Sequence, residues 1–233
     1  MLLHLEIPEP RLRVWRPEHV AGLPRLVLIA DPFTVRDVAH ATVDAVRAGL
    51  EWVHLRDDRA PNPVFWEVGR NLVGRLRRVN ENVLISINSR MEFADEWYCG
   101  VHTGAHGPSM ADIRAGGGIN GPVGYSVHSH EAARAALDAG ADYLFFSPVF
   151  ETPLKPWAPP LALSGLKRIC AVDSSAPIYA LGGVTPNRVA GCVSAGARGV
   201  AAVSAILSSD DPATEVRRFL EALRTATGDA SAV

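Results

Sequence analysis

Short apolar runs alternate with longer amphipathic stretches along this chain, from Leu26 to about Leu223. The runs are apolar on both faces, which is typical of parallel strands buried on both sides. The stretches between them have the spacing of helices that bury one face. The predicted strands are Leu26–Ala30, Trp52–Leu55, Val83–Ile87, Cys99–Thr103, Val123–Val127, Tyr143–Val149, Ile178–Leu181 and Val200–Ala205. The clearest predicted helices are Val35–Ala48, Val64–Val79, Glu131–Ala139 and Ala213–Leu223.

Repeated strand–helix units predict an α/β protein with a parallel sheet and helices outside it. Eight units favour closure into a single (β/α)8 TIM barrel, and a doubly wound open sheet is the structural alternative. Alanine–glycine pairs end three of the helical stretches, at 48–49, 139–140 and 195–196, where glycine allows a left-handed cap. Since no long linker divides these units, we expect one barrel domain over residues 26–223.

The two ends of the chain differ from this pattern. Residues 1–25 contain four prolines and scattered charges, so we interpret them as an N-terminal leader and not as a signal peptide. This leader either packs against the bottom of the barrel or stays loose. Residues 224–233 are small and polar, and we expect a flexible tail there.

Composition narrows the class of partner. The chain has 233 residues, a net charge of -2 and 48% apolar residues, so nothing in its charge favours nucleic acid or an anionic membrane. The three cysteines, Cys99, Cys170 and Cys192, have no metal-ligand spacing. An odd number is also unsuited to a disulfide framework, so we expect reduced thiols in a cytoplasmic protein.

Glycine-bearing strands near the C-terminus predict a phosphate site. Residues 177–184 and 199–206 each run from an apolar strand into a turn and a helix. TIM barrels commonly bind phosphate with the loops after their last two strands and a helix N-terminus. The predicted phosphate-binding residues are therefore Gly182, Gly183, Val203 and Ser204.

The second predicted strand ends in polar residues, where active sites of such barrels lie. Period two places His54, Arg56 and Asp58 on one face and Leu55 on the other. Arg56 can hold a phosphate or carboxylate with two hydrogen bonds. The alternative is a strand-end arginine paired with Asp57 or Asp58. We favour a ligand-binding role for His54 and Arg56.

Three other loops of the same rim carry candidate substrate-binding residues. Asn88 follows the third strand and either contacts a ligand or caps the next helix. His106 follows the fourth strand and is either a ligand contact or a solvated loop residue. Lys155, in a proline-rich loop after the sixth strand, can supply a point charge to an anion or be solvated.

The fifth strand predicts the catalytic group. Ser126 and His128 share a face at its end, and Gly124 leaves space below them. Because histidine titrates near neutral pH, His128 is the best single candidate to move a proton. We predict that Ser126 orients the substrate or this histidine.

No metal site is predicted. No cluster of histidine, cysteine and aspartate has zinc spacing, and a magnesium site for a pyrophosphate would need carboxylates at the rim. The third and fourth strands offer Asn88, Ser89 and Gly107 there, and Asp57 and Asp58 are the nearest carboxylates.

Taken in order, these motifs resemble the thiamine phosphate synthase/TenI superfamily, over residues 26–207. The motifs are His54-Leu-Arg-Asp, Ile87-Asn-Ser-Arg90, Gly100-Val-His-Thr-Gly104, Tyr125-Ser-Val-His-Ser129, Ser147-Pro-Val-Phe-Glu-Thr-Pro-Leu-Lys155, Leu181-Gly-Gly-Val184 and Gly199–Ile206. The resemblance implies a TIM barrel and a role in thiamin biosynthesis. It also adds Thr152 to the substrate-binding residues and suggests a homodimer.

The superfamily has two branches, and the residues favour the TenI-like one. The synthase branch couples a pyrimidine pyrophosphate to a thiazole phosphate with magnesium, and its second strand reads Gln-x-Arg-x-Lys. This chain has His54 and Asp58 in that pattern, and Ser89 and Gly107 where the synthase has metal-binding aspartates. The expected enzyme is therefore a thiazole tautomerase, an isomerase that acts on a small phosphorylated thiazole through His128 without a metal or other cofactor.

Two alternatives remain. The first is a divergent thiamine phosphate synthase, a transferase that would need magnesium. The second is a non-catalytic barrel that binds a thiamin-related phosphate.

Overall fold

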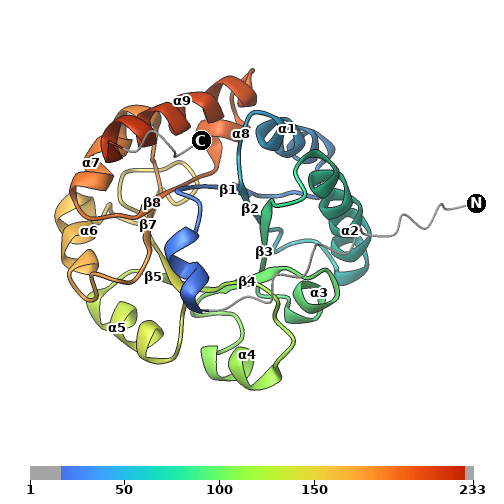
Figure 1. Cartoon of the computed structure of the whole chain (residues 1–233), viewed down its shortest axis with the longest axis horizontal. Helices are drawn as coiled ribbons and strands as arrows, with labels where there is room; N and C mark the ends of the chain where they lie inside the picture. Colours follow the sequence, from blue (N-terminus) through green and yellow to red (C-terminus); the bar gives the residue numbers. More distant parts are fainter. Residues whose placement is uncertain (1–16, 229–233) are drawn as a thin grey trace, which may run out of the picture.

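The computed structural model describes residues 17–228, and its strands close into a barrel in chain order, β1 to β8. Neighbouring strands are parallel, and β8 pairs with β1 through Leu26–Val200 and Leu28–Ala202. The view down the barrel in Figure 1 shows the helices as an outer ring around the strands. The predicted (β/α)8 TIM barrel is confirmed, and the open doubly wound sheet is excluded. The strands are β1 Leu26–Ala30, β2 Trp52–Leu55, β3 Leu84–Asn88, β4 Gly100–Thr103, β5 Val123–Val127, β6 Tyr143–Phe146, β7 Ile178–Leu181 and β8 Gly199–Ala202.

The outer ring consists of helices of unequal length. The longest, α2 and α9, flank α1 in this ring (Figure 1). None of the described helices is long and apolar enough to cross a membrane. The helices are η1 Pro17–Gly22, α1 Arg36–Arg47, α2 Asn62–Val79, α3 Met91–Glu96, α4 Met110–Gly116, α5 His130–Asp138, α6 Ala162–Cys170, η2 Pro186–Arg188, α7 Val189–Ser194, α8 Ser204–Leu207 and α9 Pro212–Thr227.

Two strands end earlier than the apolar pattern predicts. β6 ends at Phe146, because Pro148 has no N–H to continue the ladder. β8 ends at Ala202, because Val203 leaves the strand conformation and α8 begins at Ser204. In contrast, α9 runs beyond Leu223 to Thr227 and ends at Gly228, which has a φ of 67°. Residues 229–233 of the predicted tail lie outside the described residues.

Alternate residues of the strands face two different cores. Leu26, Leu28 and Ala30 point outward to the helices, whereas Val27 and Ile29 point into the barrel. The inner core is mainly aromatic: Trp52 meets Tyr143 edge to face at 4.7 Å and Tyr179 at 5.3 Å. The side chains on the inner face of each strand therefore fill the barrel.

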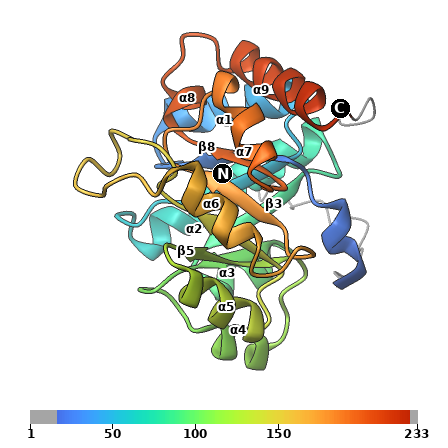
Figure 2. The same ribbon diagram turned by 90° about the vertical axis from the view of Figure 1, so that its left-hand side faces the viewer.

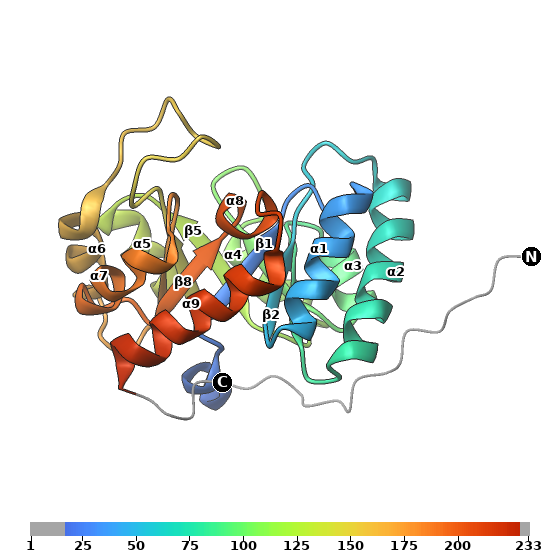
Figure 3. The same cartoon turned by 90° about the horizontal axis from the view of Figure 1, so that it is seen from above.

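The N-terminal segment covers one end of the barrel. Leu23 joins the inner core, and Tyr179 donates a hydrogen bond to the carbonyl of Pro24 at 2.8 Å. Arg198 donates to the carbonyls of Ala21 and Leu23. Figures 2 and 3 show η1 at this end and the loop between β6 and α6 at the other. Of the predicted leader, residues 17–25 thus pack against the bottom, and residues 1–16 lie outside the described residues.

Helix α2 packs one of its glycines against a buried aromatic ring. A Cβ added at Gly69 would lie 2.6 Å from the ring of Trp97, which is fully buried. At Gly74, in the same helix, the nearest atom would be 3.9 Å away, on Arg78. The two glycines therefore differ in the space around them but share a helical backbone.

This difference predicts opposite effects of alanine on stability. We expect Gly74→Ala to raise the free energy of unfolding by about 0.5–1 kcal/mol, the helix propensity of alanine over glycine. Gly69→Ala should lower it by about 1–3 kcal/mol, because the new methyl group displaces Trp97. Urea denaturation of both variants measures this. Equal stabilisation by the two substitutions would contradict the packing described.

Candidate active site

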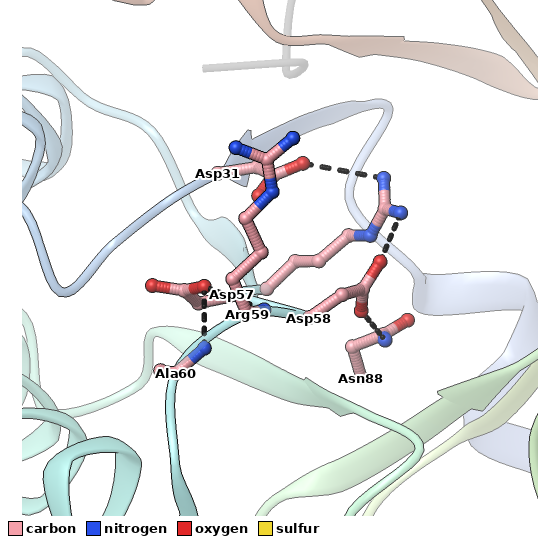
Figure 4. A network of polar contacts seen from close by, with 7 residues as sticks. Asp31, Asp57, Asp58, Arg59, Ala60 and Asn88 are labelled. Atoms are coloured by element: carbon pink, nitrogen blue, oxygen red, sulfur yellow. Dashed lines mark hydrogen bonds and ion pairs between the residues drawn. The ribbon is translucent and has the colours of Figure 1, made fainter.

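The ends of β1, β2 and β3 hold an ion-pair cluster, here called the Arg56 cluster. It consists of Asp31, Arg56, Asp58 and Asn88 (Figure 4). Arg56 bridges two carboxylates, with its Nη1 3.2 Å from Asp31 Oδ2 and its Nη2 bonded to Asp58. Asn88 donates from Nδ2 to Asp58 Oδ1 at 2.9 Å. All four residues lie where the strands end, at the open end of the barrel that we call the mouth.

Burial and charge shift the pKa of Asp31 in opposite directions. Partial burial raises the pKa of Asp31, and the charge of Arg56 opposes that effect. The Arg56 side chain keeps 40% of its surface exposed, and that of Asp58 keeps 51%. The predicted alternative for Arg56, a pairing with a neighbouring aspartate, is thus present together with an accessible guanidinium. Asp31, which the sequence reasoning did not select, is its second partner.

Asp57 lies next to this cluster but serves the backbone. Its carboxylate accepts hydrogen bonds from the backbone N–H groups of Arg59 and Ala60, both at 3.0 Å, and from the hydroxyl of Thr34. Figure 4 shows it turned away from Asp58. It is buried and holds the turn that leads into α2. Asp57 is therefore a structural residue of the loop.

The mouth does not fit a magnesium ion held by the protein. Within residues 17–228, no group of three or more histidine, cysteine, aspartate or glutamate residues is placed to hold a metal. A side chain at Gly107 would collide with Thr103 and come 2.6 Å from Ser89 Oγ. The rim carboxylates are bonded to Arg56 or, for Asp57, to backbone N–H groups. We therefore derive no chemical step through a metal ion.

His54 lies inside the barrel, beneath the mouth. It is 2% exposed, and its Nδ1 is 3.0 Å from the hydroxyl of Ser86. The same hydroxyl accepts a hydrogen bond from the indole of Trp52 at 3.1 Å. The predicted substrate contact His54 is thus surrounded by protein, and Asn88 is close enough to affect its pKa.

A second buried histidine, His102, was missed from the sequence. Its Nε2 is 2.8 Å from Ser126 Oγ, and its Nδ1 is 3.1 Å from the hydroxyl of Tyr143. Its ring stacks on Phe145 at 4.2 Å. The sequence signal for the position of His102 was Gly124, which pairs with it across the sheet. A Cβ at Gly124 would collide with Tyr143 and lie 2.5 Å from His102 Nδ1.

Both buried histidines are neutral. Burial lowers the pKa of His54 to about 3, and the charge of Arg56 adds to the effect. Burial also holds the pKa of His102 well below its ordinary value, with His54 and Arg56 contributing. Each ring therefore has one N–H donor and one acceptor nitrogen.

The other predicted residues of the fourth and fifth strands lie nearer to solvent. Ser126 is half-buried at the mouth, whereas His128 is exposed. The Nδ1 of His128 donates a hydrogen bond to the carbonyl of Ser147. His106 is exposed in the loop after β4. Of these three, Ser126 is the one joined to the buried polar interior.

The loop between β6 and α6 brings Lys155 over the mouth. Lys155 and Thr152 are half-buried, and the backbone N–H of Lys155 donates to the carbonyl of Thr152 at 3.1 Å. Burial lowers the pKa of Lys155, and the positive charge of Arg56 lowers it further. The two positive charges thus lie close enough to repel each other. An anion bound between them would reduce this repulsion.

Glycines after β7 anchor this loop. Gly182 and Gly183 have positive φ angles of 92° and 64°. A Cβ at Gly182 would lie 2.7 Å from Pro148, and one at Gly183 would collide with the carbonyl of Glu151. Val203 and Ser204 lie beside them at the start of α8. The predicted phosphate residues therefore sit together at the mouth, on the strands that close the barrel.

Comparisons with known proteins show which family has this barrel. The family profile described as Thiamine monophosphate synthase matches residues 26–206. The chain belongs to this family. It is 37% identical over 201 residues to the thiamine-phosphate synthase of Natronomonas pharaonis, covering 85% of this chain and 93% of the relative. It is 32% identical over 206 residues to that of Thermus thermophilus, covering 86% and 98%.

A solved structure supports the fold. The barrel superposes on a thiamine phosphate pyrophosphorylase from Pyrococcus furiosus with a TM-score of 0.77 at 23% sequence identity. The alignment covers 89% of this chain and 98% of that one. This family member therefore has the same arrangement of strands and helices.

The expected thiazole tautomerase is wrong. Relatives that align over nearly their whole length carry the name thiamine-phosphate synthase, a transferase and not an isomerase. The tautomerase prediction relied on carboxylates missing at Ser89 and Gly107 and on the charge of Asp58. Three positions do not outweigh similarity along 201 residues. The proton shift assigned to His128 is withdrawn with that prediction.

The neutral histidines predict a loss of stability in acid. Below pH 6.5 the unfolded chain protonates His54 and His102 while the folded chain does not, so the free energy of unfolding falls as pH falls. Each histidine should contribute a loss of about 2 kcal/mol between pH 7 and pH 5. Urea denaturation at the two pH values measures the total.

His54→Gln isolates one of these contributions. The variant should lose about 2 kcal/mol less than the wild type between the two pH values, because one titrating group is gone. His40→Gln, at an exposed position of α1, is the control and should follow the wild type. Parallel pH profiles for His54→Gln and the wild type would contradict the neutral state of His54.

The geometry of the carboxylates also predicts whether the free protein binds magnesium. Calorimetric titration with magnesium chloride should give no saturable binding, because the rim carboxylates already have partners. Saturable binding that disappears in Asp31→Asn would show that the Arg56 cluster opens to a metal ion. That result would overturn the misfit described above.

Proposed function

We propose that this protein is a thiamine-phosphate synthase that couples a pyrimidine pyrophosphate with a thiazole phosphate. The observation that carries the proposal is the 37% identity to the Natronomonas pharaonis thiamine-phosphate synthase across 93% of that protein. The family profile spans residues 26–206, the range that contains the loops of the mouth.

The proposed reaction places two demands on the site. A bond forms between the thiazole nitrogen and the pyrimidine carbon that bears the pyrophosphate, and the bond from that carbon to oxygen breaks. The pyrophosphate leaves with the electron pair, so negative charge develops on its oxygen. Fixed cations near that oxygen stabilise such a transition state.

Arg56 and Lys155 are the residues we assign to this charge. They come from different strands, and their charges affect each other over the mouth. On the other side, we assign the thiazole phosphate to the loops that contain Gly182, Gly183 and Ser204. Loop N–H groups after the last two strands of a barrel commonly bind phosphate. We also assign Asn88 and Thr152 to the binding of the substrates.

The proposal includes no metal ion held by the protein. Arg56 shares its guanidinium between Asp31 and Asp58, so a bound pyrophosphate competes with these carboxylates for its N–H groups. Within residues 17–228, Lys155 has no carboxylate partner, and we assign its charge to the leaving group. These separate roles of Arg56 and Lys155 depend on the side chains present at this mouth.

Incubation of the protein with both substrates tests the proposal. Thiamine phosphate should form, measured by chromatography after oxidation to its fluorescent thiochrome. Arg56→Gln should lower kcat/KM on the order of 10- to 100-fold, the cost of one or two hydrogen bonds to a charged group. Arg47→Gln, at an exposed arginine of α1 that pairs with Asp44, should leave kcat/KM unchanged.

Two results would contradict the assignment. No product at any magnesium concentration would remove the synthase function. Product formation by Arg56→Gln at the wild-type rate would leave the function in place and remove Arg56 from it.

A further inference from the structure

Arg188, the last residue of η2, joins two loops of the mouth. Its Nη1 donates a hydrogen bond to the carbonyl of Gly183 at 2.5 Å. Its Cζ lies 4.6 Å from the centre of the Phe150 ring, within the range of a cation–π contact. Gly183 belongs to the loop after β7, and Phe150 belongs to the loop between β6 and α6. One guanidinium therefore contacts both the loop that we assign to the thiazole phosphate and the loop that carries Lys155.

The two loops are also joined by their backbones. The N–H of Phe150 donates to the carbonyl of Gly182 at 3.0 Å. A Cβ added at Gly183 would lie 2.9 Å from the Cβ of Phe150, so only glycine allows this approach. Within residues 17–228, the carbonyl of Gly183 accepts no hydrogen bond from a backbone N–H outside the helices and strands. The first peptide group of the glycine pair is thus held by backbone, and the carbonyl of the second is held by Arg188.

These two bonds orient the N–H groups of Gly183 and Val184. In a planar trans peptide group, the C=O and the N–H point in opposite directions. Because Phe150 holds the carbonyl of Gly182, the N–H of Gly183 points away from the backbone of the β6–α6 loop. Because Arg188 holds the carbonyl of Gly183, the N–H of Val184 points away from Arg188.

Both N–H groups are available to an anion. Among the described residues, neither donates to a backbone carbonyl outside the regular helices and strands. Val184 is buried, and a buried N–H group needs a partner. Successive N–H groups that point the same way are a common anion-binding arrangement in loops.

The second peptide group needs a support of this kind. It can turn over by a change of ψ at Gly183 and of φ at Val184. Gly183 has a φ of 64°, in the region that glycine adopts readily, and it permits more values of ψ than any residue with a side chain. The bond from Arg188 therefore selects one orientation of a peptide group that the sequence leaves free to rotate.

We propose that Arg188 is a positioning residue that holds the carbonyl of Gly183 and thereby keeps the N–H of Val184 directed at the phosphate of the thiazole substrate. The guanidinium already donates to a carbonyl and covers the Phe150 ring, so its contribution to the anion is the orientation of the loop. The inference rests on the proposed function for the identity of the substrate. Binding of phosphate by the two N–H groups can be measured without turnover.

Titration of the ¹⁵N-labelled protein with inorganic phosphate tests the proposal. In the wild type, the amide proton signals of Gly183 and Val184 should move downfield and saturate, because both N–H groups donate to the anion. Arg188→Met keeps an apolar side chain against Phe150 and removes every donor. Its Kd for phosphate should be higher on the order of 10-fold, the cost of one hydrogen bond to a charged group, and the Val184 signal should lose most of its shift.

Kinetics of the same variants separate binding from chemistry. In the synthase assay, Arg188→Met should raise KM for the thiazole phosphate on the order of 10-fold and leave kcat and KM for the pyrimidine pyrophosphate close to the wild-type values. Arg188→Lys keeps the charge and one donor toward Gly183. It should recover part of the phosphate affinity and of the shift at Val184.

Arg36→Met is the matched control. Arg36 is exposed at the first residue of α1, which follows β1 at the same end of the barrel, so the variant loses one positive charge and keeps the bond to Gly183. It should bind phosphate like the wild type. Circular dichroism melts verify that the variants fold, which is expected because both arginines are exposed.

Three results would overturn the proposal. They are an unshifted Val184 signal in the wild type, wild-type phosphate affinity in Arg188→Met, and an equal loss of affinity in Arg36→Met, which would reduce the effect to charge. A negative synthase assay with a normal phosphate titration would remove the proposed function and leave the role of Arg188 in place.

Discussion

The closed barrel has an interior that its own side chains must fill, and buried polar groups there need partners. This chain fills the lower part with aromatic rings and the upper part with two histidines, two serines and a tyrosine hydroxyl. Burial keeps both histidines neutral, and hydroxyl groups of other strands contact their ring nitrogens: Ser86 for His54, and Tyr143 and Ser126 for His102. The register of the strands therefore decides the chemistry under the mouth.

Most of the fold could be predicted from the apolar pattern, since buried parallel strands have a strong signal. Four of the predicted strands, including Leu26–Ala30 and Val123–Val127, have the same bounds in the structure. The largest errors occur where a strand meets the mouth. At Pro148 and Val203 the residues stay apolar after the ladder has ended, so composition alone does not mark the boundary.

The site was harder to predict, because its contacts join residues far apart in the sequence. A pairing of Arg56 with Asp57 or Asp58 was the alternative prediction, but its second partner, Asp31, follows β1 and is brought near by the pairing of β1 with β2. His102 looked like one more residue of a short strand. Its importance depends on Gly124, whose missing side chain gives the ring and Tyr143 their space.

Asp58 shows why a single charge was a poor guide to the reaction. As an isolated carboxylate it would repel a pyrophosphate, and that argument favoured the tautomerase. In the folded protein its charge is offset by Arg56, and its oxygens are also occupied by Asn88. The electrostatic cost of an anion at this mouth therefore depends on the whole Arg56 cluster, in which two carboxylates, one guanidinium and one amide share their hydrogen bonds. A substitution that reverses one charge in sequence can therefore leave the local field much smaller than its formal sign implies.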